Sequence, residues 1–371
     1  MKVGIDTFGS DHGRSGVGSY LASFVKGLPT ESENQYELFG SELDRYTFDS
    51  GEGKISYAGI DIDDKPLSNK FWHFFSLNRF AKKQGYDIIL FPAGSRMLPL
   101  FSSIPTVVVI NEVVSEMLKS VSFLYRLYMI KSLRHATKII ATSKYIFEDL
   151  LKLKIKPKQI EIIHNGIDHS LFYPRNEFSS DVVIIRPFAI KKPYFIYASR
   201  IEYPEKQHIE LIKAFNLFKK KTLLPHRLVL AGVDGVNAEK VHKEAANSEF
   251  ASDIFLIGYF PHESLPELYS CADACLFPAI TEGVGLPIIE AMACGIPVAC
   301  ATEGVLPEIA GDCALYFDTK NIQEMADTIE QIVVDKEKRS YLIRCGFDWV
   351  RRFSWDTTVE KTIAVLTSLV K

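Results

Sequence analysis

The sequence predicts an α/β protein built from two doubly wound, Rossmann-like domains, each a parallel sheet with helices on both faces. Short apolar segments of strand length alternate with amphipathic helical stretches along the whole chain, and this alternation is typical of parallel sheets covered by helices. The chain has 371 residues, which is long for one domain and sufficient for two. We expect the domains to face each other across a cleft, because ligands of such sheets collect at the carboxyl ends of the strands.

The first half contains six apolar segments that predict strands, with helical periodicity between them. The predicted strands are Lys2–Asp6, Tyr36–Gly40, Ile88–Phe91, Thr106–Ile110, Lys138–Ala141 and Ile160–Ile163. The predicted helices include Gly18–Leu28, Phe71–Gln84, Phe123–Ala136 and Lys144–Leu153.

The second half repeats this scheme. The predicted strands are Tyr194–Ala198, Arg227–Ala231, Ile254–Leu256, Ala274–Phe277, Pro297–Ala301 and Ala314–Phe317, and the predicted helices include Ile209–Lys220, Leu265–Ser270 and Ile322–Val334. The domain boundary falls in residues 172–192, which predicts domains over residues 1–172 and 173–352. Within this linker, Asp181–Ile185 has the pattern of a short strand.

Composition narrows the class of protein. The chain is 47% apolar and 24% charged, as in an ordinary soluble protein, and its net charge of −3 argues against general nucleic-acid binding. The spacing of the six cysteines matches neither a zinc site nor a disulfide framework, so we expect buried free thiols in a reducing compartment. The first residues enter a strand pattern without a signal peptide, and no apolar run reaches the roughly 18 residues of a membrane span. The prediction is a cytoplasmic protein, with peripheral contact at the inner face of a membrane left open.

The strongest chemical motif is the segment Glu282-Gly-Val-Gly-Leu-Pro-Ile-Ile-Glu290. Its glycine-rich loop leads into a helix that Pro287 starts and that places Glu290 about one turn in. A loop at a helix N-terminus offers free N–H groups and a partial positive charge to a phosphate. The flanking carboxylates of Glu282 and Glu290 can hold sugar hydroxyls. This motif therefore predicts a ligand that is both anionic and polyhydroxylated, such as a sugar nucleotide.

Arg200 and Lys206 form a second candidate site in the same domain. Arg200 follows a predicted strand and Lys206 precedes a predicted helix, so both cations can reach the mouth of the sheet. There they could neutralise a diphosphate leaving group. The alternative is that these two cations lie at the surface and form ion pairs with Glu202 and Glu205.

Three loops of the first domain carry weaker signals. Gly16 and Gly18 follow the first strand and could let the backbone approach a phosphate, or could serve only the conformation of the loop. Asn111-Glu112 ends a strand and is a candidate for the cleft or for a helix cap. Asn165-Gly166 is interpreted as a structural turn.

Two stretches, residues 70–83 and 119–138, combine aromatic and basic side chains. Apolar residues at helical spacing usually face a core. The basic residues beside them would also suit an anionic membrane surface or a lipid acceptor.

Together these motifs resemble those of the retaining glycosyltransferases of family 4, which have the GT-B fold. The resemblance covers nearly the whole chain and is strongest over residues 194–317. Its most specific element is the pair of glutamates seven residues apart, Glu282 and Glu290. Members of this family have similar segments at three further positions: Leu230-Ala231-Gly232, Leu256-Ile257-Gly258-Tyr259 and Asn165-Gly166-Ile167-Asp168.

The resemblance implies a role for each matched residue of the donor side. Glu290 would accept hydrogen bonds from the ribose, Arg200 and Lys206 would hold the diphosphate, and Glu282 would contact the transferred sugar. Gly283, Val284, Gly285 and Leu286 would offer backbone N–H groups, Gly258 and Tyr259 would border the base, and Gly16 and Gly18 would face the diphosphate from the other domain. Residues 353–371 would form a final helix that crosses back to the first domain.

One departure from the family pattern concerns Asn111-Glu112, which stands where many members have His-Asp. Asparagine can donate a hydrogen bond but cannot carry a proton at neutral pH. The loop also has Gly-Val-Gly where Gly-Phe-Gly is common. From the resemblance as a whole, the candidate catalytic residues are Glu282, Arg200, Lys206 and Asn111.

The implied activity is transfer of a hexose from a nucleoside-diphosphate sugar to a hydroxyl of a glycan or lipid-linked acceptor, with retention and without a metal or other cofactor. Asp61-Ile62-Asp63 has the spacing of a metal motif but stands in a polar, turn-like stretch. Three alternatives remain: an epimerase acting on sugar nucleotides, an NAD-dependent dehydrogenase, and a non-catalytic binder of sugar nucleotides. The dehydrogenase is disfavoured because the loop between the first strand and Gly16 is too long for a tight dinucleotide-binding turn.

Overall fold

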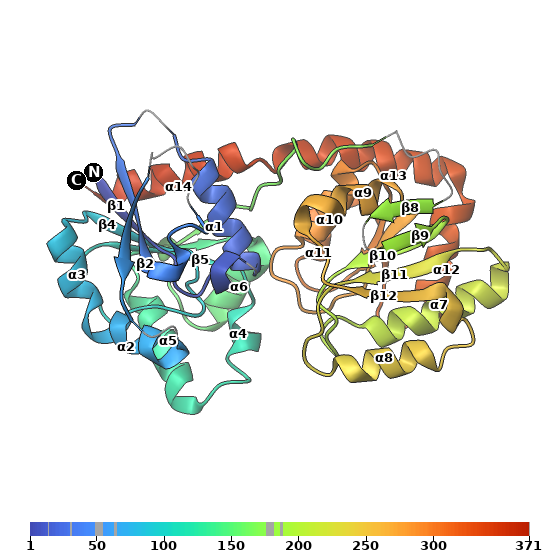
Figure 1. Cartoon of the computed structure of the whole chain (residues 1–371), viewed down its shortest axis with the longest axis horizontal. Coiled ribbons are helices and arrows are strands. Elements are labelled where there is room, and N and C mark those ends of the chain that lie inside the picture. The colour runs from blue at the N-terminus through green and yellow to red at the C-terminus, as the bar shows by residue number, and fades with distance from the viewer. Residues whose placement is uncertain are drawn as a thin grey trace. The chain divides into compact units, whose positions relative to one another are not determined.

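The computed structural model describes residues 1–13, 15–29, 32–48, 55–62, 65–175, 182–185 and 188–370. The chain divides into two compact units (Figure 1). The first unit comprises Met1–Gly166 together with Phe353–Lys371, and the second comprises Ile167–Arg352.

The first unit is built on a parallel sheet of seven strands in the order β3-β2-β1-β4-β5-β6-β7. The order reverses direction at β1 and β4, as in a doubly wound sheet. The strands are β1 (Lys2–Asp6), β2 (Gln35–Ser41), β3 (Ser56–Ile60), β4 (Ile88–Phe91), β5 (Thr106–Ile110), β6 (Lys138–Ala141) and β7 (Ile160–Ile162). The sequence prediction missed β3, an edge strand with only one fully buried side chain, Ile60.

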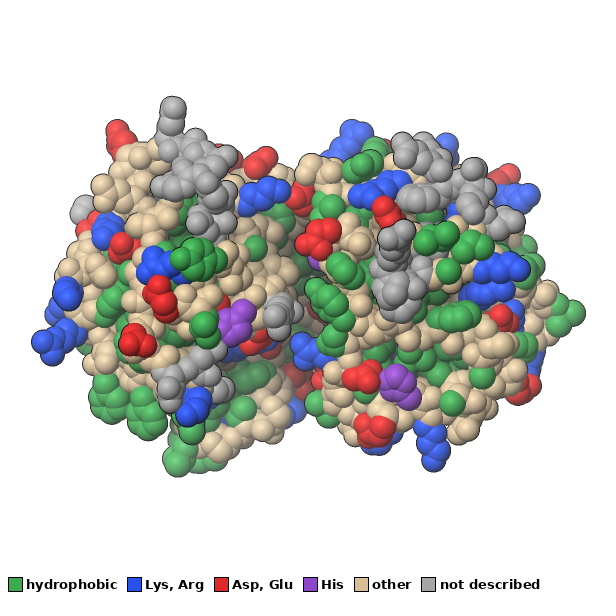
Figure 2. Space-filling model, in the orientation of Figure 1, with side chains coloured by type: hydrophobic (Ala, Val, Ile, Leu, Met, Phe, Trp, Pro, Cys, Tyr) green, Lys and Arg blue, Asp and Glu red, His purple; other side chains and the backbone are tan. Residues whose placement is uncertain are grey.

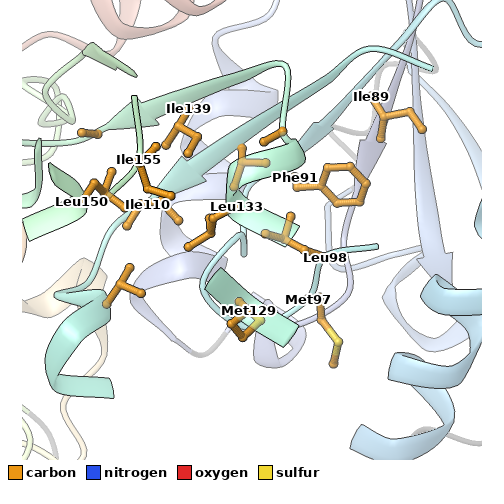
Figure 3. Close-up of a cluster of buried hydrophobic side chains, with 14 of the residues drawn as sticks. Ile89, Phe91, Met97, Leu98, Ile110, Met129, Leu133, Ile139, Leu150 and Ile155 are labelled. Carbon is orange, nitrogen blue, oxygen red and sulfur yellow. The ribbon is translucent and has the colours of Figure 1, made fainter. Parts of the chain in front are cut away.

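Helices cover both faces of this sheet, and alternate residues of each strand enter different cores. Ile89 and Phe91 of β4 point into the core under α3, α5 and α6 (Figure 3), whereas Ile88 and Leu90 point into the core under α1 and α14. The helices are α1 (Gly16–Lys26), α2 (Pro66–Phe75), α3 (Leu77–Gln84), α4 (Val114–Met117), α5 (Phe123–His135), α6 (Lys144–Lys152) and α14 (Trp355–Leu369).

The prediction of one continuous helix over Phe71–Gln84 was wrong. The structure has two helices, α2 and α3, separated at Ser76, whose backbone angles are φ −105° and ψ −29°. Ser76 and the two residues before it, Phe74 and Phe75, are all exposed. No buried side chain therefore fixes the chain in a single helix at this point.

A buried ion pair anchors α2 to the end of β1. His73 Nε2 lies 2.8 Å from Asp6 Oδ2, and His73 Nδ1 lies 2.6 Å from the carbonyl oxygen of Asn69. Because both ring nitrogens face acceptors only, the imidazole must donate from both and is positively charged. Burial lowers the pKa of His73, but the charge of Asp6 and the two hydrogen bonds outweigh it and raise that pKa. The pair fixes the strand end from which the glycine-rich loop at Gly16 departs.

The second unit contains a parallel sheet of six strands in the order β12-β11-β10-β13-β14-β15. The strands are β10 (Tyr194–Ala198), β11 (Arg227–Ala231), β12 (Ile254–Gly258), β13 (Ala274–Phe277), β14 (Val298–Ala301) and β15 (Ala314–Phe317). The helices are α7 (His208–Thr222), α8 (Ala238–Ala246), α9 (Leu265–Ser270), α10 (Leu286–Ala293), α11 (Leu306–Ala310), α12 (Ile322–Val334) and α13 (Lys336–Trp349). The two parallel α/β sheets confirm the predicted fold class.

The predicted linker at residues 172–192 carries a small antiparallel sheet, β8 (Val182–Ile185) paired with β9 (Phe188–Lys191). The prediction of a short strand over Asp181–Ile185 is confirmed for Val182 onward. Asp181 lies outside the described residues, as do the rest of residues 176–181 and residues 186–187.

The prediction that all six cysteines are free was wrong for one pair. Cys313 and Cys345 form a disulfide across 32 residues, because α13 packs against the turn that contains Cys313. The other four, Cys271, Cys275, Cys294 and Cys300, are free and buried. Burial raises the pKa of Cys294 to about 12, so this thiol is a poor nucleophile at neutral pH. Among the residues described, no helix has the length and apolar character needed to span a bilayer.

The helix α14 packs on the sheet face that α1 also covers. Val359 and Leu366 belong to the core beneath α1, and the rings of Trp355 and Tyr20 lie 5.5 Å apart. Its start passes directly over Gly166, where a Cβ atom would lie 2.2 Å from the backbone nitrogen of Trp355. Asn165 and Gly166 do not form a turn, but the interpretation of this segment as structural is supported, since the close approach of α14 requires the glycine.

We predict that Gly166→Ala lowers the free energy of unfolding by about 1–3 kcal/mol, because the added methyl group forces the start of α14 away from its core. Denaturant unfolding of both proteins measures this difference. The matched control is Gly16→Ala, since a Cβ atom on Gly16 meets nothing within 4 Å. Equal stability of the Gly166→Ala variant and the parent would show that α14 does not depend on this contact.

Candidate functional site

Two of the predicted site residues of the second unit contact each other directly. Lys206 lies in the loop between β10 and α7, and Glu282 lies in the loop between the neighbouring strand β13 and α10. Lys206 Nζ is 2.5 Å from Glu282 Oε2, and the two side chains are only 17% and 20% exposed. The same two loops are also joined through the backbone, where Ile280 N–H donates to the carbonyl oxygen of Glu205 at 3.0 Å. The ion pair thus fixes a cation and a carboxylate at one edge of the sheet.

Arg200 stands two residues beyond the end of β10 and is exposed. Its aliphatic part lies against the backbone of Gly235, where a Cβ atom would be 2.8 Å from Arg200 Cδ. Among the described residues, neither Arg200 nor Lys206 forms an ion pair with Glu202 or Glu205. The structure therefore gives no support to the alternative in which the two cations form surface ion pairs with these glutamates.

The glycine-rich loop ends where α10 begins. Gly285 is the N-cap residue of α10 and has φ +72°, a left-handed conformation that glycine adopts without strain. Gly285 and the preceding Gly283 are buried, whereas Val284 and Leu286 are half-buried. The loop starts at Glu282 and therefore runs from the ion pair with Lys206 to the positive end of the helix dipole of α10.

Glu290 is buried on the second turn of α10, with 6% of its surface exposed. Its Oε1 lies 3.2 Å from Nε2 of His262, a half-exposed residue in the turn before α9. The His262 ring also packs edge-on against Phe172 at 5.1 Å. The hydrogen bond to Glu290 raises the pKa of His262, although partial burial opposes it. Sequence reasoning missed His262, because neither its spacing nor its neighbours indicate a partner 28 residues away.

Gly258 and Tyr259 stand at the end of β12. A Cβ atom on Gly258 would meet nothing within 4 Å, and the Tyr259 side chain is 67% exposed. The strands β12, β11, β10 and β13 are consecutive in the parallel sheet, so their carboxyl ends share one edge. The structure therefore brings Tyr259, Arg200, Lys206 and Glu282 to the same edge of the second unit.

In the first unit, Gly16 and Gly18 differ in their surroundings. A Cβ atom on Gly18 would lie 2.5 Å from both Gly13 Cα and the carbonyl oxygen of Ser10, and Gly18 N–H donates to Ser15 Oγ at 3.2 Å. Close packing of the loop thus accounts for Gly18. Gly16 is exposed at the start of α1, and a Cβ atom there would meet no described atom within 4 Å.

Asn111 at the end of β5 pairs with a residue that the sequence analysis assigned to a turn. Asn165 Nδ2 donates to Asn111 Oδ1 at 3.0 Å. Asn111 Nδ2 and Asn165 Oδ1 are both buried without a hydrogen-bond partner among the described residues. Exchanging the two ends of both amides would again leave one donor and one acceptor unused. The adjacent Glu112 is held by Ser95 Oγ at 2.6 Å and by Arg96 Nε at 3.3 Å.

Metal ligands are not grouped in the part of the chain that the structure describes, where no cluster of three or more His, Cys, Asp or Glu residues could hold an ion. Of the motif Asp61-Ile62-Asp63, Asp63 lies outside the described residues.

Two family models match the sequence. The model described as "Glycosyltransferase Family 4" matches residues 14–171, and the model described as "Glycosyl transferases group 1" matches residues 184–349. Among curated proteins, an O-antigen chain mannosyltransferase B of Escherichia coli is 29% identical over 64% of this chain and 63% of its own length. A D-inositol 3-phosphate glycosyltransferase of Kribbella flavida is 23% identical over 56% of this chain and 51% of its own length. The chain thus matches about half to two thirds of the length of these relatives.

Solved structures share the fold over the whole chain. A sucrose-phosphate synthase from Thermosynechococcus elongatus superposes with a TM-score of 0.77 at 18% identity, covering 100% of this chain and 99% of the other. Anabaena HepE in complex with UDP and glucose superposes with a TM-score of 0.76 at 17% identity, covering 99% of this chain and 100% of the other.

We predict that Glu290→Gln lowers the pKa of His262 toward its ordinary value near 6.5, because the variant loses the carboxylate that stabilises the protonated ring. NMR titration of the histidine ring protons measures this value, and a His262→Asn spectrum assigns the resonance. The matched control is Glu263→Gln, which removes a charge that contributes less to the shift.

The same pair makes a pH-dependent contribution to stability. The pKa of His262 is higher in the folded protein than its value near 6.5 in the unfolded chain. The ion pair therefore contributes fully to the free energy of unfolding at pH values below about 6.5. This contribution disappears as the pH rises through the pKa of His262 in the folded protein. An unchanged His262 pKa in Glu290→Gln would show that the two side chains do not interact in solution.

Proposed function

Since the chain belongs to the glycosyltransferases of family 4, with the GT-B fold, we propose that it transfers a hexose from a nucleoside-diphosphate sugar to an acceptor hydroxyl, with retention at the anomeric carbon. The observation that carries the proposal is the Lys206–Glu282 ion pair, which stands beside the N-terminus of α10. Arg200 lies at the same edge of the sheet and forms no ion pair with any described residue. This arrangement suits a ligand with a negative diphosphate next to a group rich in hydroxyls.

The diphosphate would exchange places with Glu282 at Lys206. Lys206 Nζ is held by the Glu282 carboxylate. An arriving diphosphate offers stronger negative charge to Lys206 and Arg200, which together can offset two negative charges. Glu282 is then released and can accept hydrogen bonds from the sugar attached to that diphosphate. The ion pair therefore couples recognition of the phosphate to recognition of the sugar.

The nucleoside would lie along the sheet edge toward β12. Glu290 would accept hydrogen bonds from the ribose hydroxyls, and His262, which now holds Glu290 at 3.2 Å, would keep that carboxylate oriented. Gly258 and the exposed ring of Tyr259 would border the base, since open space surrounds Gly258 and an aromatic ring offers a stacking surface. Gly283 to Leu286 would supply backbone N–H groups between the two ends of the donor.

For the chemical step, we propose that the protein aligns the reactants and stabilises charge without an enzyme nucleophile. The acceptor hydroxyl would attack on the face from which the diphosphate departs, and the departing oxygen would take the acceptor proton. Arg200 and Lys206 would stabilise the charge that develops on that oxygen. Since these cations offset the diphosphate charge, the proposed reaction needs no metal. Asn111, which stands where many family members have a histidine near the transferred sugar, is proposed as a hydrogen-bond donor to that sugar.

The relatives suggest the donor and acceptor classes. One relative is named as a mannosyltransferase of an O-antigen chain, and one structural neighbour was solved with UDP and glucose. We propose a hexose donor and a glycan acceptor, free or lipid-linked, and a cytoplasmic reaction. Calorimetric titration with UDP-, GDP- and ADP-hexoses identifies the base, and binding of none of them would contradict the proposal.

We predict that Lys206→Ala and Glu290→Ala each weaken binding of the preferred donor about tenfold to a hundredfold, the effect expected for a lost hydrogen bond to a charged group. Calorimetry measures the affinity, and thermal unfolding verifies that both variants stay folded. The matched control is Lys213→Ala, an exposed lysine on α7 in the same unit. Affinities equal to the parent in both variants would remove these residues from the site.

Glu282→Ala separates the two parts of the donor. Because the variant frees Lys206, we predict that it binds the bare nucleoside diphosphate at least as tightly as the parent, while it binds the sugar nucleotide more weakly. An equal loss for both ligands would contradict the proposed role of Glu282.

NMR observation of the donor decides between transferase and the other candidate activities. We expect slow release of free sugar from the donor without acceptor. Conversion into an epimeric sugar nucleotide would instead establish an epimerase, and binding with no turnover under any condition would establish a non-catalytic binder.

A further inference from the structure

Large apolar side chains gather on the outer surface of α2 and α5 in the first unit. They are not part of the core beneath these helices, which uses Trp72, Met129 and Leu133. The exposed side chains, with their exposed fractions, are Leu67 (70%), Phe71 (63%), Phe74 (44%), Phe75 (70%), Phe123 (71%), Leu124 (77%) and Leu127 (50%).

These residues form one surface, which we call the aromatic face. Lys70 on α2 places its Nζ 4.0 Å from the centre of the Tyr125 ring on α5, so the two helices are joined side by side. Figure 2 shows hydrophobic side chains gathered at the lower edge of this unit, where Figure 1 places α2 and α5.

The charge around the aromatic face is strongly positive, although the whole chain is slightly negative. The helices α2, α3 and α5 contain seven Lys and Arg residues and no Asp or Glu residue, in a chain with a net charge of −3. Several of these cations are exposed and have no ion pair with any described residue: Arg79, Lys82, Lys83, Arg126 and Lys131. Arg126 and Lys131 stand on α5, which also carries Phe123, and the other three cations stand on α3, which follows α2 directly in the chain.

We propose that the aromatic face docks this protein on the surface of an anionic lipid bilayer. Aromatic and leucine side chains can enter the boundary between headgroups and acyl chains, while lysine and arginine beside them attract anionic headgroups. A second copy of this chain fits the face poorly, because a two-fold interface would bring the same positive groups together. The proposal rests on the first unit alone and does not depend on the activity proposed for the second.

Vesicle flotation of the full-length chain tests this surface. The probes are vesicles of pure phosphatidylcholine and vesicles in which a third of the lipid is phosphatidylglycerol. We expect binding to the anionic vesicles that is at least tenfold stronger than to neutral ones and that falls as salt is added, since exposed charges are screened by ions.

Two sets of substitutions separate the apolar and the charged contributions. The apolar set is Phe71→Ser, Phe75→Ser, Phe123→Ser and Leu124→Ser, and the charge set is Lys82→Gln, Lys83→Gln, Arg126→Gln and Lys131→Gln. Since all eight side chains are exposed, both variants should fold. The charge set should lower partitioning onto anionic vesicles at least tenfold, because each basic residue near the bilayer surface contributes about fivefold. The apolar set should also lower partitioning at least tenfold, because it removes side chains that enter the boundary between headgroups and acyl chains.

The control variant is Leu43→Ser with Tyr46→Ser. These side chains are 69% and 82% exposed in the same unit, but they stand beside Glu42 and Asp44. We expect this variant to bind vesicles as the parent does. Failure of the parent to float with anionic vesicles would overturn the proposal, and so would equal binding by the parent and the apolar set. A parent that is dimeric in solution, and that the apolar set converts to a monomer, would assign the face to a second copy and also overturn it.

Discussion

The ion pair between Lys206 and Glu282 is the interaction on which the account of the site depends. It joins the loops that follow two neighbouring parallel strands, β10 and β13, across a distance of 2.5 Å. Glu290, the second acid of the motif, is likewise held by a cation-forming side chain, His262. Both carboxylates therefore have a cationic partner within the second unit. Donor binding would exchange these partners for groups of the ligand, so neither carboxylate would become an unpaired buried charge, which is costly.

Local sequence patterns sufficed for most of the fold and for the positions of the loops. Runs such as Thr106–Ile110 are buried on both faces of the sheet, and such runs have few interpretations other than a parallel strand. The motif around Gly285 was predicted because a glycine-rich loop followed by Pro287 is a strong local signal of a helix start. Arg200, Lys206 and Glu282 were predicted separately, and the sheet order explains why all three lie at one edge of the sheet.

Pairings between residues distant in sequence could not be predicted. The disulfide of Cys313 with Cys345, the amide pair of Asn111 with Asn165, and the contact of Gly166 with α14 all depend on how elements pack. Helical periodicity in residues 70–83 and 119–138 did not distinguish core packing from a membrane surface, because the same helices carry a buried apolar face and an exposed apolar face. Only the burial of individual side chains distinguishes Trp72, which packs on the core, from Phe71, which is exposed.

A crystal structure of the chain with its preferred nucleoside-diphosphate sugar tests the central claim most directly. The account predicts that Lys206 Nζ leaves Glu282 and lies within hydrogen-bond distance of a phosphate oxygen, with Arg200 on the same diphosphate and Glu282 on a sugar hydroxyl. A donor bound elsewhere, with the Lys206–Glu282 pair intact, would contradict it.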